Sequence, residues 1–384
     1  MMKRVAVVLL AVATVMPAVA QLGNDGFYRV QNAKSKRYAT VVDNKAENKD
    51  VTSTTNIDLY AINTRKADEV MSDPGSVFYI EKEEVANGYI LRAQGMDTYK
   101  LTNMYLKISS PDEIAGAYYL YGTDSGMWRF LKESDSKYNT FGFYYVATEA
   151  DRRNESCRWN IIPVTDADDQ YFGLKTDIEV DRKHYSTLYT SFAYQLSTGM
   201  KAYYIRQCNG QMAEMIEITG NIVPENTPVI IECNSDKTAD NKITPLKNSP
   251  TEIGKNQLNG IFFCNVIKWT DGEEEKNFFN WNTTDYDAAT MRVLGKVNGK
   301  LAFVKADNMK YLPANKAYLM VNSSAAADIE IVGADKYPSG INDMKAEKDN
   351  SKNSIYSLNG NKVSKDNIPT GVYVIDGKKT IIRR

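Results

Sequence analysis

The chain has 384 residues, with 47 Lys and Arg against 48 Asp and Glu, and a formal net charge of −1. A nucleic-acid-binding surface normally carries a basic excess, so this balance argues against nucleic acid as a partner and against adhesion to a membrane through a polybasic segment. At roughly 100–200 residues per domain, the length predicts two or three domains.

The first 20 residues have the layout of a secretory signal peptide. Lys3 and Arg4 precede an apolar stretch over residues 5–15, and Ala18-Val19-Ala20 supplies a small-residue cleavage site before Gln21. Removing these two basic residues from 47 leaves 45 against 48 acidic residues, a net charge of −3. No later apolar run approaches the roughly 20 residues of a membrane-spanning helix. We expect an exported mature chain without a transmembrane segment, located at the outer-membrane surface or outside the cell, with the periplasm as the alternative.

The dominant local pattern is a series of short runs rich in Tyr, Val, Ile, Phe and Thr, separated by Gly, Asn and Asp. Such runs are typical of short β-strands, and the 25 tyrosines suit half-buried sheet surfaces. The clearest predicted strands cover residues 27–30, 77–81, 89–93, 118–121, 141–146 and 159–164. The sequence therefore predicts an all-β protein.

One segment has a helical pattern instead. Between residues 55 and 71, Leu59, Ile62 and Val70 fall near one helical face, a capping-box spacing opens the segment, and Asp-Pro-Gly at 73–75 ends it. We expect a single inserted helix here.

Residues 21–165 resemble a ricin-type β-trefoil, in a form typical of secreted proteins from Bacteroidetes. The resemblance rests on three motifs, which are Gly-Phe-Tyr-Arg-Val-Gln-Asn at 26–32 with Lys-Arg-Tyr-Ala at 36–39, Ile-Leu-Arg-Ala-Gln-Gly at 90–95, and Trp-Asn-Ile-Ile-Pro-Val at 159–164. It implies three similar lobes around a pseudo-threefold axis and, in many relatives, shallow sugar sites. A lectin lobe often carries Gln-x-Trp, where this chain has Cys157-Arg158-Trp159. The packing tryptophan is kept and the glutamine is missing, so no sugar-site residue can be transferred.

The second half contains an internal similarity at an offset of 89 residues. Asn-Gly at 209–210 matches Asn-Gly at 298–299, and Pro-Glu-Asn at 224–226 matches Pro-Ala-Asn at 313–315 without a gap. Asn-Gly favours a tight hairpin turn, and Pro-x-Asn marks a corner before a buried strand. We expect a duplicated β-sandwich-like module, with a first copy at 166–252 and a second at 253–334, which pack as one sandwich or as two small domains. Chance similarity is the alternative, because such turn residues are common in β proteins.

Residues 335–354 are dominated by Lys, Asp, Asn, Ser and Glu and are predicted to be a linker. Two hairpins are predicted after it, turning at Asn359-Gly360 and at Asp376-Gly377. Residues 355–384 resemble the sorting tails of type IX secretion cargo, through Leu-Asn-Gly at 358–360, Ile-Pro-Thr-Gly-Val-Tyr at 368–373 and the two terminal arginines. The resemblance implies a tail that directs outer-membrane passage. A small β appendage on the preceding domain is the alternative.

The four cysteines all follow the leader, where an oxidising compartment permits disulfides. We expect buried thiols or one structural disulfide. Four cysteines allow three pairings, and the pair that we prefer is Cys208 with Cys233, because both end or interrupt strand-like segments of one region. The spacing from Cys157 to Cys264 contains no C-x-x-C pair, and His184 is the only histidine. We therefore expect neither a zinc site nor any other metal or cofactor.

No catalytic constellation can be identified in the sequence. A Ser-His-Asp or Cys-His arrangement would have to use His184, which lies in a polar turn before an aromatic strand and is expected to be an ordinary surface histidine. Neither Gly-x-Ser-x-Gly nor a P-loop is present. Glycoside hydrolysis needs only two carboxylates, yet no particular pair stands out. We expect a protein that is not an enzyme.

Two acidic clusters have a binding interpretation and a simpler one. Aspartates at 166, 168 and 169 offer oxygens to calcium but lack the glycine-punctuated EF-hand loop, so a solvated turn is favoured. The acidic loop at 271–275 is bordered by aromatic residues, among which Trp269, Trp281 and Tyr286 are our candidate ligand-binding residues. The simpler interpretation is a charged hairpin tip with its aromatic side chains facing the core.

These features together predict an exported binding protein that recognises a glycan or an extracellular protein without catalysis. Exposed loops on rigid β scaffolds commonly serve such roles. The alternatives are an accessory or degenerate member of a secreted carbohydrate-active system, and a structural surface-layer component without a small ligand.

Overall fold

The computed structural model describes residues 25–41, 62–83, 88–93, 107–108, 117–124, 127–133, 141–145, 154–248, 253–261, 268–271, 274–277, 285–309, 312–322, 324–338, 355–357, 362–363, 368, 370–375 and 378–382. They belong to two compact units, Met1–Ile331 and Val332–Arg384. Within the described residues, helix is confined to α1 (Ala67–Val70) and to 3-10 turns at Pro74–Ser76, Glu155–Cys157 and Thr238–Asp240. The all-β prediction is confirmed.

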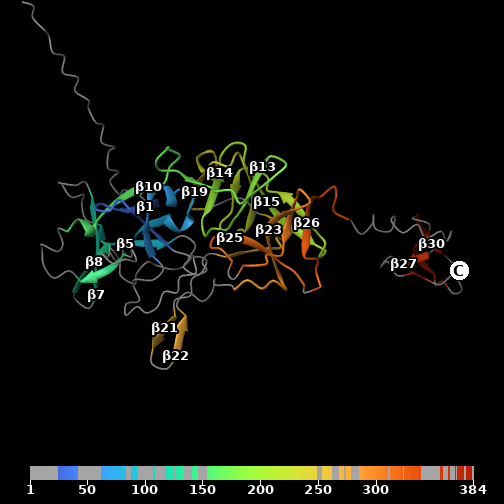
Figure 1. Cartoon of the computed structure of the whole chain (residues 1–384). Helices are drawn as coiled ribbons and strands as arrows, with labels where there is room; N and C mark the ends of the chain where they lie inside the picture. Colours follow the sequence, from blue (N-terminus) through green and yellow to red (C-terminus); the bar gives the residue numbers. More distant parts are fainter. Residues whose placement is uncertain are drawn as a thin grey trace, which may run out of the picture. The chain divides into compact units, whose positions relative to one another are not determined.

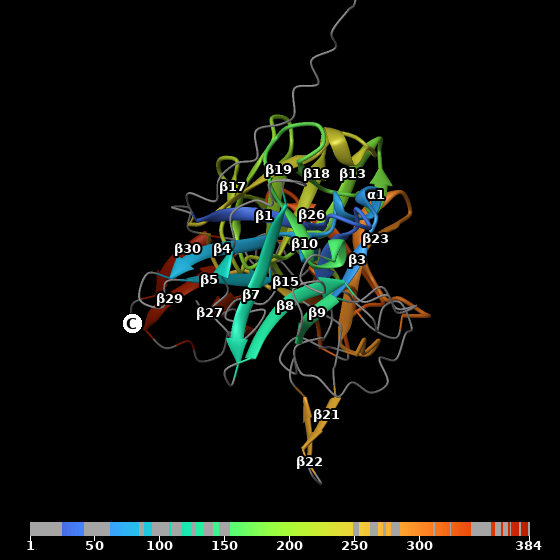
Figure 2. The same ribbon diagram turned by 90° about the vertical axis from the view of Figure 1, so that its left-hand side faces the viewer.

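The first part of the chain forms one antiparallel sheet, whose central path runs β3-β2-β1-β10-β7-β8-β9 and whose remaining strands attach at β1, β4 and β7. Figure 2 shows β7 and β8 running side by side. The strands are β1 (Gly26–Asn32), β2 (Tyr38–Val41), β3 (Ile62–Arg65), β4 (Phe78–Glu83), β5 (Gly88–Ala93), β6 (Lys107–Ile108), β7 (Tyr118–Asp124), β8 (Met127–Glu133), β9 (Phe141–Tyr145) and β10 (Arg158–Pro163). All six of the clearest predicted strands of this part are present.

The first and last strands of this sheet pair with each other, from Tyr28↔Pro163 to Asn32↔Trp159. Trp159 is fully buried, and its indole Nε1 donates a hydrogen bond to the Leu131 carbonyl at 2.9 Å, which satisfies its one polar atom. The threefold repetition of a trefoil would involve residues 42–61 and 94–106, which lie outside the described residues. The trefoil stays a prediction.

The expected helix over residues 55–71 is wrong at residues 62–65, and its residues 55–61 lie outside the described residues. Residues 62–65 form strand β3, paired with β2 from Val41↔Ile62 to Tyr38↔Arg65, and among the described residues of this segment only the four of α1 are helical. Sheet pairing outweighs the weak helical pattern here, because each residue of β3 gains a partner across the strand pair. The Asp-Pro-Gly segment does form a turn, in which the Asp73 carboxylate accepts a hydrogen bond from the Gly75 N–H at 2.9 Å.

The two predicted modules contribute to one ten-stranded sheet, in the order β12-β13-β18-β15-β16-β26-β24-β23-β25-β20. Its strands β13, β15, β23, β25 and β26 are labelled in Figure 1. They are therefore halves of one sheet and do not form two separate domains. To this sheet residues 166–252 contribute β12 (Ile178–Val180), β13 (Lys183–Leu188), β15 (Lys201–Cys208), β16 (Met212–Glu217) and β18 (Val229–Cys233). Those that follow are β20 (Leu258–Ile261), β23 (Met291–Val297), β24 (Lys300–Val304), β25 (Lys316–Met320) and β26 (Asp328–Gly333).

The two halves of this sheet repeat the same pairing at the offset of 89 residues found in the sequence. In the first half β15 lies between β18 and β16, and in the second β23 lies between β25 and β24. Ala202 pairs with Ile231, and Met291 pairs with Met320, which is the same pair once each residue number is shifted by 89. Equal strand order and equal register support duplication over chance similarity.

The corner asparagines of the two copies share a backbone conformation, whereas the hairpins differ. Asn226 has φ 54° and Asn315 has φ 58°, both in the left-handed region that asparagine tolerates. The second copy has the expected two-residue hairpin, with Asn298 and Gly299 both at positive φ between Val297 and Lys300. The first copy has a longer turn, because Cys208 pairs with Ala213 and the β15–β16 register shifts after Ile205.

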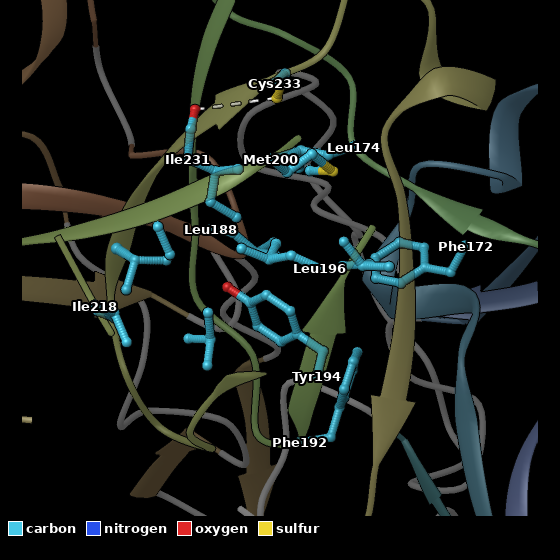
Figure 3. Packing of buried hydrophobic residues seen from close by; sticks show 14 of the residues in the cluster. Phe172, Leu174, Leu188, Phe192, Tyr194, Leu196, Met200, Ile218, Ile231 and Cys233 are labelled. Atoms are coloured by element: carbon cyan, nitrogen blue, oxygen red, sulfur yellow. Dashed lines mark hydrogen bonds between the residues drawn. The ribbon is translucent and has the colours of Figure 1, made fainter. Parts of the chain in front are cut away.

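A second, four-stranded sheet covers one face of the first module and makes it a sandwich. Its order is β11-β19-β14-β17, with bounds β11 (Phe172–Gly173), β14 (Ala193–Leu196), β17 (Ile222–Val223) and β19 (Lys242–Leu246). The buried cluster between the sheets includes Tyr194 of β14, whose ring lies among Leu188, Leu196 and Phe192 in Figure 3. The opposite face of the large sheet has its own apolar cluster, to which both modules contribute, for example through Ile205 and Phe303.

Two further sheets complete the described structure. Strands β21 (Lys268–Asp271) and β22 (Glu274–Asn277) form the predicted acidic hairpin and pair only with each other among the described strands. The second unit contains a sheet of order β28-β27-β29-β30, with bounds β27 (Ile355–Ser357), β28 (Lys362–Val363), β29 (Gly371–Ile375) and β30 (Lys378–Ile382). Both predicted C-terminal hairpins are therefore present, and β27 joins them by pairing with β29.

Candidate functional site: a cavity at the seam of the two modules

The seam, where residues 166–252 meet residues 253–331, is fixed at one corner by two hydrogen bonds between Tyr189 and Asn315. The Tyr189 N–H donates to the Asn315 carbonyl at 2.9 Å, and the Asn315 side-chain amide donates to the Tyr189 carbonyl at 3.0 Å. The Tyr189 ring lies against Gly260 of β20, where a Cβ atom would come within 2.1 Å of it. Glycine is required at this position because any side chain would displace the ring.

A polar network lies beside this corner. The ammonium of Lys316, the first residue of β25, donates to both carboxylate oxygens of Asp177 at 2.8 and 2.7 Å and to the Ser186 hydroxyl at 2.8 Å. The Asp177 carboxylate also accepts hydrogen bonds from the Ser186 hydroxyl at 2.8 Å and the Thr187 N–H at 3.3 Å. An ammonium has three N–H donors, so Lys316 has none left for another partner.

Local structure places these groups together. Asn315 has a positive φ and forms the turn immediately before Lys316, the residue at which β25 begins. Asp177 precedes β12, and its N–H donates to the Tyr185 carbonyl of β13 at 2.8 Å. The side chains of Lys316 and Asp177 are 28% and 35% exposed, so the network lies at the rim of the seam and not in the core.

A half-open cavity of about 180 Å³ adjoins this network. Asp177 and Thr187 contribute from the first module, together with Lys316 from the second. The rest of the lining is apolar or aromatic and comes from β23, β25 and the segment before β25, namely Val293, Leu294, Met309, Leu312, Pro313, Ala317 and Tyr318. Because the ionic groups bind each other, the cavity offers a ligand mainly apolar surface.

Tyr286 packs beside residues of the cavity lining, and its hydroxyl both donates and accepts a hydrogen bond. Its hydroxyl donates to the Met291 carbonyl at 3.1 Å and accepts from the Ala306 N–H at 2.8 Å. Its ring packs against a cluster that contains Leu312, one of the cavity-lining residues. Tyr286 therefore positions the wall of the cavity.

The two tryptophans of the predicted binding site are not brought to the cavity by any described contact. Trp269 is in β21, opposite Lys276 of β22. Trp281 lies outside the described residues. The structure therefore describes neither an aromatic platform nor a contact among Trp269, Trp281 and Tyr286.

His184 lies within β13 and not in a turn before it. It pairs with Glu179 of β12 and with Cys233 of β18, and its side chain is partly exposed. Ser186 is fully buried, and the lysine next to its hydroxyl is held by a carboxylate. A serine nucleophile must reach a substrate, and this hydroxyl is buried and hydrogen-bonded to Asp177.

The predicted Cys208–Cys233 disulfide is wrong, because both thiols are free. Cys233 follows Glu232, whose partner Lys201 stands seven residues before Cys208 in β15. At about 3.3 Å per residue the two cysteines are on the order of 20 Å apart along the sheet, far beyond the reach of a disulfide. They also belong to different apolar clusters, on opposite faces of the sheet.

Burial makes both thiols poor nucleophiles. Desolvation raises the pKa of Cys208, although the Gly210 N–H donor opposes the effect. Desolvation, with Asp177 as a further cause, raises the pKa of Cys233 to about 12. The thiolate fraction is therefore small at neutral pH.

The acidic turn at the start of the first module is held by a lysine. The Lys242 ammonium donates to the Asp166 carbonyl at 2.8 Å and to the Asp168 carboxylate at 3.0 Å, while the Asp168 side chain is fully exposed. Among the described residues, no three His, Cys, Asp or Glu side chains are grouped so that they could hold a metal ion.

Sequence reasoning missed the cavity and its polar rim. Asp177 and Lys316 stand 139 residues apart and belong to no motif. The one available signal was the Pro-Ala-Asn corner at 313–315, which marks where β25 begins and so places Lys316 at a strand start.

No helix among the described residues is long and apolar enough to cross a membrane.

No family model and no curated protein matches the chain. One similar solved structure is described as "Structure and mode of action of a mosquitocidal holotoxin", with 9% sequence identity and a TM-score of 0.27. The similarity covers 77% of this chain and 51% of that one, so the chain spans about half the length of that protein. A TM-score this low assigns neither a shared architecture nor a shared function.

Proposed function

We propose that the chain is an exported, noncatalytic binding protein that recognises an extracellular protein through the cavity at the seam. The signal-peptide pattern of residues 1–20 supports export. The tail's resemblance to type IX sorting tails supports a place at the cell surface. The trefoil-like segment serves in this proposal as a neighbouring scaffold without an assigned sugar site.

The observation that carries the proposal is the apolar lining of a cavity whose ionic rim is internally satisfied. A sugar presents many hydroxyl groups and binds well only where polar side chains are free to pair with them. Here the ammonium of Lys316 has used its three donors on Asp177 and Ser186. An apolar cavity with few polar groups instead suits a buried anchor side chain of a protein partner.

Catalysis is disfavoured by the same contacts. A general acid or base must reach a substrate proton with a free donor or acceptor. Lys316, Asp177 and Ser186 bind one another, and His184 is not among the described residues that line the cavity. The site therefore supports binding better than turnover.

Arrays of extracellular proteins and glycans test this function. The purified chain is compared with Val293→Phe, which fills the cavity, with the matched control Val297→Phe in the same strand, and with the Trp269→Ala/Trp281→Ala double variant. We expect a protein partner whose binding is lost in Val293→Phe and kept in Val297→Phe. A glycan bound through the tryptophans, or turnover on a polysaccharide panel, would show the proposal to be wrong.

A further inference from the structure

We infer that the seam cavity takes a neutral apolar group about the size of one aromatic ring or one branched aliphatic side chain. This inference rests on the proposed function and specifies the chemistry of the ligand at the same site. The group can belong to a side chain of a partner protein or to a small free molecule, because both present the same surface to the cavity.

The volume of the cavity sets the size of the group. The cavity holds about 180 Å³. An apolar cavity of about 150 Å³ in another protein stays dry and binds benzene, so a volume of this order suits one ring and excludes a second. A disaccharide or a folded peptide segment does not fit inside, although either can lie across the mouth.

The charges at the rim set the polarity of the group. An anionic ligand would have to replace Asp177 at the Lys316 ammonium, and a cationic one would have to displace Lys316 from Asp177. Either exchange breaks the hydrogen bonds between Lys316 and the partly buried Asp177 carboxylate, and it also removes the charge of the ligand from water. A neutral apolar group leaves the network intact and gains contact with the apolar wall.

The wall is preformed, which favours binding of a small group. Val293 and Tyr318 face each other in the β23–β25 register, so two paired strands carry one side of the cavity. Ala317 and Leu312, also in the lining, are 3% and 2% exposed and belong to packed apolar clusters. A ligand therefore meets a surface that needs little ordering.

Methyl-detected NMR on the full chain tests the inference with defined probes. Toluene and N-acetyl-leucinamide represent the free molecule and the protein side chain, and methyl glucoside and N-acetyl-lysinamide are polar and charged controls of similar size. We expect the first two to shift the methyl signals of Leu312, Ala317 and Val293 saturably in the millimolar range. The two controls should leave these signals in place.

Two variants localise the effect. Val293→Phe should abolish the shifts at Leu312 and Ala317, and Val297→Phe in the same strand should keep them. Thermal midpoints and methyl spectra without ligand establish that each variant is folded.

The outcomes separate this inference from the proposed function. Saturable shifts with toluene alone support a small free ligand, and shifts with N-acetyl-leucinamide support an anchor side chain. The inference is overturned if no probe shifts these methyl signals at a concentration on the order of 10 mM, at which a Kd in the millimolar range would be detected. It is also overturned if only methyl glucoside or N-acetyl-lysinamide shifts them. The proposed function would still hold in that case if the protein array yields a partner whose binding is lost in Val293→Phe.

Discussion

The ammonium of Lys316 lies 2.8 and 2.7 Å from the two carboxylate oxygens of Asp177, which stands 139 residues earlier in the chain. The pair joins the two copies of a duplicated module at the position where they share a cavity. Two hydrogen bonds between Tyr189 and Asn315 fix the same corner, one between backbone groups and one donated by the Asn315 side-chain amide. The seam is therefore held by ionic and backbone contacts on one side and by a shared apolar cluster on the other.

The Lys316–Asp177 pair should contribute a small coupling free energy. We expect a double-mutant cycle with Lys316→Met and Asp177→Asn to give about 1 kcal/mol at low salt, because the pair is partly exposed. Raising the ionic strength should reduce the coupling. Urea denaturation of the four proteins measures it, and a coupling of zero at low salt would show that the pair adds nothing to the seam.

The two corner asparagines should respond differently to glycine. Glycine adopts positive φ without strain, so Asn226→Gly should change stability by no more than about 0.5 kcal/mol. Asn315→Gly should cost about 1 kcal/mol or more, because the buried Asn315 amide donates to the Tyr189 carbonyl. Asn226→Ala should cost about 1 kcal/mol through backbone strain alone. Denaturation midpoints would contradict this account if the two glycine variants behaved alike.

Glu214 should make the first module sensitive to acid. Hydrogen bonds from Arg206 and Gln207 hold the pKa of this buried carboxyl below its ordinary value of 4.5. Its contribution to stability is therefore complete above about pH 4.5 and is lost as the pH falls through the lowered folded-state value. Glu214→Gln should be less stable than the parent at pH 7, and the gap should narrow below pH 4.

The control for this prediction lies in the same strand. Glu217 pairs with Lys201 at 3.0 Å on the surface, where both side chains are about half exposed. Glu217→Gln should therefore change little at either pH. Equal pH dependence in the two variants would contradict a special role for Glu214.

Tyr286 should stabilise the cavity wall through its hydroxyl. Tyr286→Phe keeps the ring but leaves the Met291 carbonyl and the Ala306 N–H without this partner, so we expect a loss of about 1–2 kcal/mol. Tyr145, which is 57% exposed, provides the matched control, and Tyr145→Phe should stay within about 0.5 kcal/mol. Urea midpoints of both variants decide between this role and a purely ligand-facing tyrosine.

Cys208 and Cys233 should both react with a thiol reagent in unfolded protein that has not been reduced. In the native protein Cys208 should be labelled first, because it is only partly buried, whereas Cys233 is buried with its pKa raised to about 12. Mass spectrometry of peptides after iodoacetamide treatment measures both rates. A peptide pair linked through these two cysteines would contradict the structure.

The strands were predictable because their signals are local. Tyr- and Ile-rich runs bounded by turn residues marked β1, β4, β5, β7, β9 and β10, and Asn-Gly marked the β23–β24 hairpin. The helix prediction failed at residues 62–65 because pairing with β2 is a long-range contact that periodicity does not contain. The longer first hairpin likewise depends on a register shift after Ile205, which the matching Asn-Gly letters do not reveal.

The sequence by itself determined the all-β class, most strand positions and the repeat at 89 residues, since alternation, turn chemistry and internal similarity are properties of neighbouring or aligned residues. Only the tertiary structure decided that the copies share one sheet, that Cys208 and Cys233 lie far apart, and that Asp177, Ser186 and Lys316 meet beside a cavity. Those outcomes depend on the order and register of strands that are separated along the chain, by 139 residues for the contact of Asp177 with Lys316. The hydrogen bonds between paired strands join backbone groups, which are the same whatever the side chains are. The sequence of one strand therefore carries little information about which strand pairs with it.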